Sequence, residues 1–104
     1  MGKRGNIDEL TTLLALALTH RIGGLVNLNE IYSEKYRKES DVFLKEALKI
    51  SLTQNWNIND KIKIKNLLEK KLRESLEKRD FLDNKKFDLI EKEINNVLVS
   101  LSLN

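Results

Sequence analysis

Residues 10–22, LTTLLALALTHRI, decide the fold class of this chain. Apolar side chains recur along this stretch at spacings of three and four residues, which is the period of one face of an α-helix. Ala15 and Leu16 widen this apolar stripe until little of the middle of the helix is polar. The stretch therefore predicts a helix over residues 7–22 that is buried on most of its sides. The positions on its main stripe are Leu10, Leu13, Leu14, Ala17, Leu18 and Ile22.

The ends of this helix must be inferred from capping residues, because the 104 residues include no proline. Asn6 and Glu9 have the spacing of a capping box, in which the Asn side chain accepts from the first turn and the acid reaches back. The pair Gly23-Gly24 supplies residues that readily adopt the left-handed conformation found at helix ends. We therefore expect the helix to begin at about Asn6 and to end before Gly23.

The same period predicts further helices over residues 30–38, 41–54, 60–79 and 84–101. The first two of these can also form one bent helix. Residues Lys61–Lys65 alternate between polar and apolar, as a short strand does, but a helical stripe continues directly from them. The expected N-caps are Asn29, Ser40 or Asp41, Asn59 or Asp60, and Asp83.

These patterns predict an all-α fold in which residues 1–104 form a single-domain bundle of four to five helices. The sequence has no internal repeat, low-complexity tract or linker that would divide it. Short connections favour antiparallel neighbours in helical bundles. We therefore expect consecutive helices to lie side by side.

The composition argues against most kinds of catalytic site. Without cysteine there is no thiol nucleophile, thiolate metal site or disulfide. His20, the only histidine, lacks a recognisable nucleophile or a second metal ligand. Gly23-Gly24 follows a helix, whereas phosphate-binding loops follow a strand, and no segment has the ligand spacing of a calcium loop. We therefore predict no enzymatic activity, cofactor, metal or small-molecule substrate.

The longest apolar run, Leu13–Leu18, is far shorter than the roughly 20 residues that cross a bilayer. It also lacks the small-residue cleavage site of a signal peptide. We therefore predict no membrane association and a cytoplasmic location.

The net charge of +3 is confined to one part of the chain. Residues 1–60 are neutral, whereas residues 61–86 contain ten Lys and Arg against five Asp and Glu. On a helix, Lys63, Asn66, Lys70 and Arg73 would share one solvent face that can follow phosphates. Alternatively, the glutamates between the lysines make this an ordinary solvated face. The candidate nucleic-acid-binding residues are Lys61, Lys63, Lys65, Lys70, Lys71, Arg73, Lys78 and Arg79.

Three aromatic residues are candidate contacts for a partner. Trp56, the only tryptophan, lies in an asparagine-rich segment between two expected helices. Tyr32 and Tyr36 lie one helical turn apart among basic residues, a grouping that suits base stacking or a partner helix. The alternative is that Trp56 folds back onto the core and that the tyrosines form the core face of their helix.

These observations lead to one main functional hypothesis. It is a non-catalytic accessory or adaptor subunit of a larger assembly that handles nucleic acid, in DNA replication, repair or transcription. The alternative is a protein-only interaction module, either an inhibitor of a partner enzyme or a homodimer formed through the apolar seam of residues 84–101. A helix-turn-helix regulator across the Gly23-Gly24 turn is less favoured, because residues 23–29 exceed the usual turn length.

Overall fold

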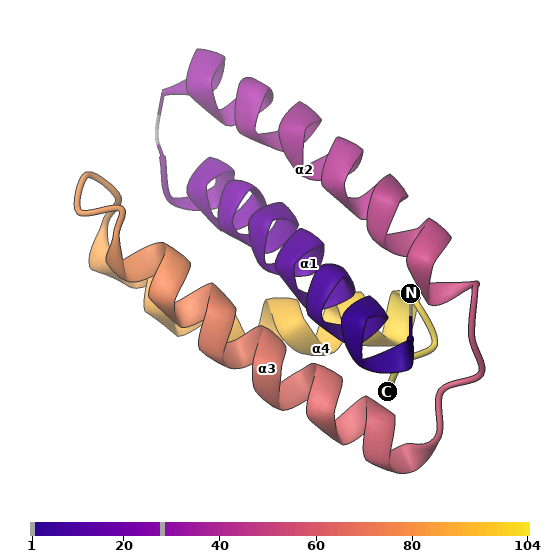
Figure 1. The fold of residues 1–104 in the computed structure, drawn as a ribbon. Coiled ribbons are helices and arrows are strands. Elements are labelled where there is room, and N and C mark those ends of the chain that lie inside the picture. Colours follow the sequence, from indigo (N-terminus) through magenta and orange to yellow (C-terminus); the bar gives the residue numbers. More distant parts are fainter. Residues whose placement is uncertain (1, 28) are drawn as a thin grey trace.

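The computed structural model describes residues 2–27 and 29–104, and it confirms the predicted all-α single-domain bundle. The described residues contain no strand, so the alternating segment Lys61–Lys65 is helical (Figure 1). The elements are α1 (Lys3–Val26), α2 (Glu30–Ser51), α3 (Ile58–Glu77), the 3-10 helix η1 (Asn84–Leu89) and α4 (Ile90–Ser100).

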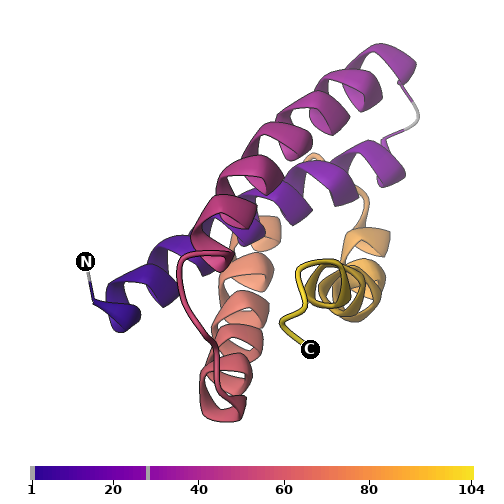
Figure 2. The same cartoon turned by 90° about the vertical axis from the view of Figure 1, so that its right-hand side faces the viewer.

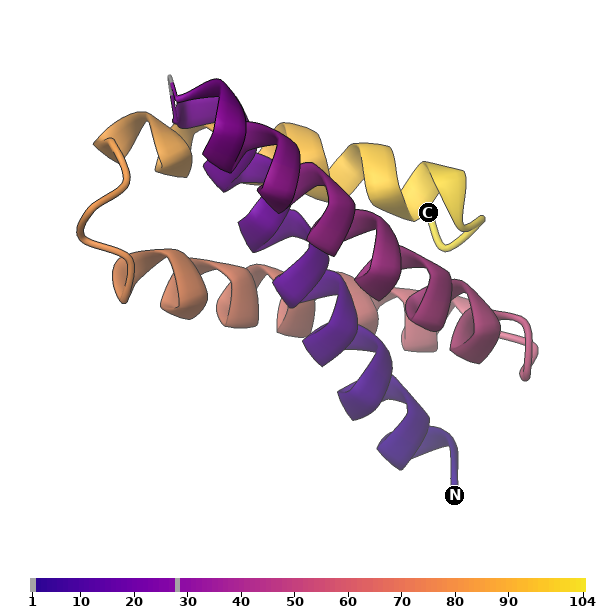
Figure 3. The ribbon, with the colours of Figure 1, turned by 90° about the horizontal axis from the view of Figure 1, so that it is seen from above.

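The helices form two antiparallel pairs that cross each other. Helices α1 and α2 run side by side and pass diagonally over the pair formed by α3 and α4 (Figures 2 and 3). Helix α1 contacts every other helix, whereas α2 packs against α1 alone among the described elements. The expectation that consecutive helices always lie side by side is therefore wrong for α2 and α3. The segment between Ser51 and Ile58 carries the chain from one layer to the other.

The core lies where α1 crosses α3, and the predicted apolar stripe of α1 is confirmed as part of it. The buried leucines and isoleucines follow one another at spacings of four residues on both helices, which aligns the two stripes. Helix α4 closes the core from the side with Ile90, Ile94 and Leu98. The fully buried leucines and isoleucines on α1 and α3 are Leu10, Leu14, Leu18, Ile22, Ile64, Leu68, Leu72 and Leu76.

Both predicted ends of the first helix are wrong. Helix α1 begins at Lys3 after Gly2, which provides no side-chain cap, so Asn6 and Glu9 lie within the helix. At the other end the helix continues through the glycine pair to Val26, and no glycine has a positive φ.

The glycine pair has a packing role in place of a terminating one. A Cβ atom on Gly24 would lie 3.2 Å from the carbonyl oxygen of Ser33, and one on Gly23 would lie 3.4 Å from the ring of Tyr36. The Ser33 hydroxyl donates to the Gly24 carbonyl at 2.8 Å. The absence of a side chain on Gly24 therefore allows α2 to approach α1 closely.

Helix α2 is one continuous helix, so the predicted interruption between residues 38 and 41 is absent. Asn29 is confirmed as its N-cap, because the Asn29 side chain accepts from the Ile31 N–H at 3.1 Å. Ser40, proposed as the start of a new helix, is buried against α1 at 3% exposure. The loss of apolar pattern before residue 41 therefore reflects the packing of α2 against a single neighbour.

Helix α3 begins at Ile58, two residues earlier than the predicted start at residue 60. Asn57 is its N-cap: the Asn57 side chain accepts from the Asp60 N–H at 2.8 Å, and the Asp60 carboxylate accepts from the Asn57 N–H at 3.0 Å. The predicted caps Asn59 and Asp60 are thus inside the helix, with Asp60 as the acidic partner in a capping box.

The last predicted helix is divided into η1 and α4. Asp83 is confirmed as a cap, because its side chain accepts from the Lys85 N–H at 2.9 Å. Lys86 is only 2% exposed, and its ammonium donates at 2.6 Å to the carbonyl of Arg79, just past the C-terminal end of α3. A cation is stabilised near the negative, C-terminal end of a helix dipole, which favours the buried position of Lys86. Lys86 itself lies in the 3-10 helix that follows.

Candidate nucleic-acid interface

The first turn of α1 and the middle of α3 border an open hollow. Arg4, Lys63 and Lys70 line this hollow, which we call the basic hollow, together with Asn66. Two acids, Asp8 and Asp60, also reach it. The remaining lining residues are Gly2, Lys3, Gly5, Ile7 and Leu67.

The two acids of the basic hollow are held by their own lysines. Lys3 contacts Asp60 at 2.6 Å, and Lys71 contacts Asp8 at 2.8 Å. The Lys3 ammonium and the Asn57 N–H hold the pKa of Asp60 below its ordinary value, and the Lys71 ammonium lowers the pKa of Asp8 in the same way. Both carboxylates therefore remain ionised and paired at neutral pH.

Three cations of the basic hollow have no such partner. Within the described part of the chain, Arg4, Lys63 and Lys70 form no ion pair shorter than 4.0 Å, and all three side chains are exposed. The first turn of α1 contains no acid, so the positive end of its dipole adds to their potential. The result is a local positive surface that attracts anions.

Lys71, one of the predicted phosphate contacts, has a structural role. Its ammonium donates to the carbonyl and the carboxylate of Asp8 and to the hydroxyls of Thr11 and Thr12, at 2.8 to 2.9 Å. These acceptors occupy the donors of Lys71 and tie α3 to the first turns of α1. The ammonium of Lys71 is therefore occupied by contacts within the chain.

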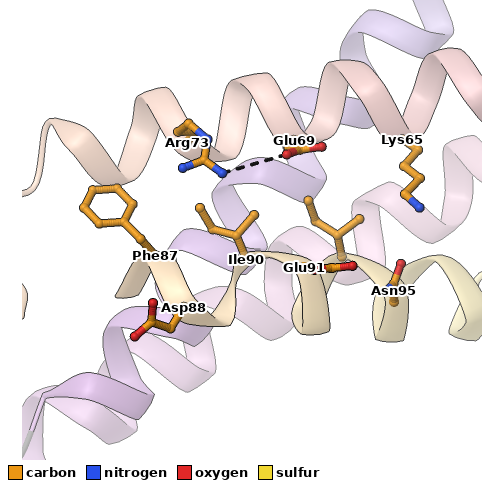
Figure 4. A pocket seen from close by; sticks show the side chains of 9 residues that line it. Lys65, Glu69, Arg73, Phe87, Asp88, Ile90, Glu91 and Asn95 are labelled. Carbon is orange, nitrogen blue, oxygen red and sulfur yellow. Dashed lines mark ion pairs between the residues drawn. The ribbon is translucent and has the colours of Figure 1, made fainter. Parts of the chain in front are cut away.

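Lys65 and Arg73 line a different hollow, a groove between α3 and α4 (Figure 4). Ile90 and Phe87 contribute its apolar part, and Arg73 lies 3.8 Å from Glu69. Three acids, Glu69, Asp88 and Glu91, outnumber the two bases along this groove. The structure thus brings Lys63, Asn66 and Lys70 together and places Arg73 beside acids.

The other predicted basic residues are also dispersed. Lys78 and Arg79 lie near the C-terminal end of α3, where the Arg79 guanidinium donates to the Ser75 carbonyl at 3.3 Å. Lys61 is half-buried near the start of α3. Lys86, counted in the basic 61–86 region, is buried and cannot reach a phosphate. The basic residues of the 61–86 region therefore lie on several separate surfaces.

The three aromatic candidates lie in three different environments. Trp56 is half-buried against the core, and its indole N–H donates to the Ser51 carbonyl at 2.8 Å. Tyr36 packs against Gly23 and lies 5.8 Å from the His20 ring, in the contact between α1 and α2. Tyr32 is 54% exposed. Of the three, Tyr32 presents the most open side chain to a partner.

His20 contributes to packing between helices. Its Nδ1 lies 2.7 Å from the Leu16 carbonyl oxygen, and its Nε2 lies 2.8 Å from a carboxylate oxygen of Glu39 on α2. Across the described residues, no group of three or more His, Asp or Glu side chains could hold a metal ion. No helix in this described portion is both long and apolar enough to cross a bilayer.

Sequence reasoning missed Lys3 and Arg4, which lie about 60 residues from the basic cluster in the sequence. Only the packing of α1 across α3 brings them to Lys63 and Lys70. No family model matches the chain, and no match was found among curated proteins or solved structures.

Proposed function

We propose that this chain is a non-catalytic adaptor subunit of an assembly that handles nucleic acid, and that it contacts the phosphate backbone through the basic hollow. The observation that carries this proposal is the convergence of Arg4, Lys63 and Lys70 on one open surface without ion-pair partners among the described residues. Lysine and arginine that neutralise phosphates release counterions, which drives binding.

The size of the basic hollow limits what it contributes alone. Three cations correspond to about three phosphate contacts, and each contact on duplex DNA contributes about −0.9 to the slope of log affinity against log salt. Such a surface binds weakly at physiological salt and positions a backbone without reading bases. It therefore suits a subunit whose partners provide the remaining affinity.

The arrangement of the helices supports this reading over the alternatives. Helices α1 and α2 run side by side (Figure 2), unlike the helices of a helix-turn-helix, which cross at about 90–120°. The seam suggested for a homodimer is also occupied, because Ile90, Ile94 and Leu98 are 3% exposed within the chain's own core.

Fluorescence anisotropy with a labelled 30-base-pair duplex over a salt series tests the proposal. The informative variant replaces Arg4, Lys63 and Lys70 by Ala, and the matched control replaces Lys78, Lys85 and Lys92 by Ala. Both remove three positive charges from exposed positions. We expect at least a tenfold loss of affinity at low salt in the first variant, a flatter salt dependence, and a much smaller loss in the control.

Two results would overturn the proposal. One is the absence of binding by the unmodified protein at low salt. The other is an equal loss of affinity in both triple variants, because that would show attraction by net charge and no role for the basic hollow.

A further inference from the structure

The outer face of α2 carries a regular pattern of apolar and basic residues that packs against no other described helix. Because α2 packs only against α1, its opposite face is open along the whole helix (Figure 3). Ile31, Val42 and Leu52 lie on that face and are 79%, 60% and 77% exposed. Three apolar side chains so exposed contribute little to the fold of this chain.

Four lysines fill the spaces between these apolar residues. Lys35, Lys38, Lys45 and Lys49 are all exposed. With Ile31, Val42 and Leu52 they complete a line of residues at alternating spacings of four and three, which we call the lysine stripe. Alternation of four and three is the spacing at which one helix meets another along its length.

The lysine stripe is narrow and is bordered by acids. Glu34 and Asp41 lie along one side of it, and Glu39 and Glu46 along the other, as their places on the helix require. The bordering acids form only solvent-exposed pairs with the stripe, at 3.5 Å for Lys38 with Glu34 and 3.1 Å for Lys49 with Glu46. Exposed pairs of this kind contribute little and exchange readily for other partners.

This charge pattern discriminates among possible occupants. A flat anionic membrane would meet the bordering acids as well as the lysines, and like charges repel. A second copy of α2 would place lysines against lysines, because the stripe is nearly symmetric about Val42. A single helix lying along the stripe meets the lysines and the apolar residues while its own flanks face the acids.

We propose that the lysine stripe binds an acidic amphipathic helix of a partner protein. Glu or Asp side chains of that helix pair with Lys38 and Lys45, and its leucines or isoleucines pack on Val42, Ile31 and Leu52. This surface lies on α2, which contributes no residue to the basic hollow. The chain can therefore hold a protein and a phosphate backbone at separate places.

A pair of synthetic helices tests the proposal by isothermal titration calorimetry. The acidic peptide has about 21 residues, with Leu and Glu together forming one line of positions at alternating spacings of four and three. The basic peptide has the same sequence with Lys in place of each Glu. The stripe variant is Lys38→Glu with Lys45→Glu. The control variant, Lys85→Glu with Lys92→Glu, makes the same charge change at exposed positions outside α2.

We expect the acidic peptide to bind the unmodified protein and the control variant with similar affinity. Affinity for the stripe variant should be at least tenfold lower, and the basic peptide should prefer the stripe variant to the unmodified protein. Duplex binding should be equal in the stripe and control variants, which separates a failure here from a failure of the proposed function.

Three outcomes would overturn the inference. The first is no binding of the acidic peptide, or equal loss of it in the stripe and control variants. The second is sedimentation with vesicles containing phosphatidylserine that is lost only in the stripe variant, which would assign the surface to membranes. The third is a dimer in light scattering that the stripe variant dissociates, which would assign it to a second copy.

Discussion

The contacts that α1 makes with α3 and with α2 differ in what they bury. Between α1 and α3, aligned leucines and isoleucines are almost completely buried, and Lys71 and Lys3 add polar links at one end. Between α1 and α2, the fully buried apolar residue contributed by α2 is Ala47, and Leu44 and Ile50 are half-buried against the core. Ser33, Tyr36 and the pair of His20 with Glu39 add further contacts, several of them polar. One interface is a hydrophobic core, and the other is a close contact that is partly polar.

This difference teaches that stability is unevenly distributed in a chain of this size. Local opening requires little free energy where few apolar contacts are lost. Helix α2 should therefore open and exchange its amide protons before α1, α3 and α4 do. The four predictions that follow test this contrast, beginning with the largest expected effect.

The largest effect is expected from truncating matched leucines on the two sides of α1. Leu68→Ala on α3 removes a fully buried side chain and should lower the free energy of unfolding by about 2–5 kcal/mol. Leu44→Ala on α2 removes a half-buried one and should lower it by about 1–2 kcal/mol. Urea denaturation measures both, and equal losses would contradict the proposed contrast.

The next effect concerns the close approach of α2 to the glycine pair. Gly24→Val places a branched side chain against the Ser33 carbonyl, which a Cβ atom would already approach to 3.2 Å. We expect a loss of about 1–3 kcal/mol, with faster amide exchange concentrated in α2.

Gly23→Ala is the matched control for Gly24→Val. Its Cβ atom would meet only the Tyr36 ring, at 3.4 Å. Because alanine favours a helix over glycine by up to about 1 kcal/mol, this change should leave stability equal or slightly higher. Equal destabilisation by both substitutions would show that close packing at Gly24 is not the cause.

A smaller effect is expected at the end of α4, on the well-packed side. Ser102 has a φ of 57°, and the Leu103 N–H donates to the Leu98 carbonyl at 2.8 Å, which is the geometry of a Schellman motif. Ser102→Gly should raise the free energy of unfolding by about 0.5–1 kcal/mol, because glycine adopts this conformation without strain. Thermal denaturation measures the gain, and amide exchange in α2 should not slow.

The smallest effect is expected in acid, at the polar links between α1 and α3. The pKa values of Asp8 and Asp60 are lowered in the folded chain from 3.8. The unfolded chain therefore binds these protons more tightly. The stability that the two carboxylates contribute is complete above about pH 4 and is lost as the pH falls through their folded pKa values.

Variants of both acids provide the measurement for that pH dependence. Asp60→Asn and Asp8→Asn should each flatten the fall in melting temperature between about pH 4 and pH 2. Glu91→Gln changes an exposed acid outside these links and serves as the control. A fall that is equally steep in all four proteins would show that neither link contributes.

The parts of the fold that were predictable are those set by local periodicity. The apolar stripe of α1 identified the central helix, and Asn29 and Asp83 identified two caps. The wrong boundaries have tertiary causes. Gly23-Gly24 resembles a stop signal, but the close approach of α2 requires glycine at position 24 within a helix.

Of the two helices that border the candidate site, only the contribution of α3 was predictable from the sequence. Lys63 and Lys70 follow from the spacing of basic residues on one helix, and the structure places both at the basic hollow. Arg4 depends on the crossing of α1 over α3, which no pattern in residues 3–26 indicates. Lys71 and Lys86 could not be separated from the other lysines, because their partners are distant residues or a helix end.

The position of Trp56 also gives the chain a natural optical probe. It is the only tryptophan, and the ammonium of Lys3 lies 5.9 Å from the centre of its ring. A nearby cation alters indole fluorescence, and Lys3 borders the basic hollow. Emission from the unlabelled protein should therefore report whether a phosphate in the hollow displaces Lys3 from its pair with Asp60.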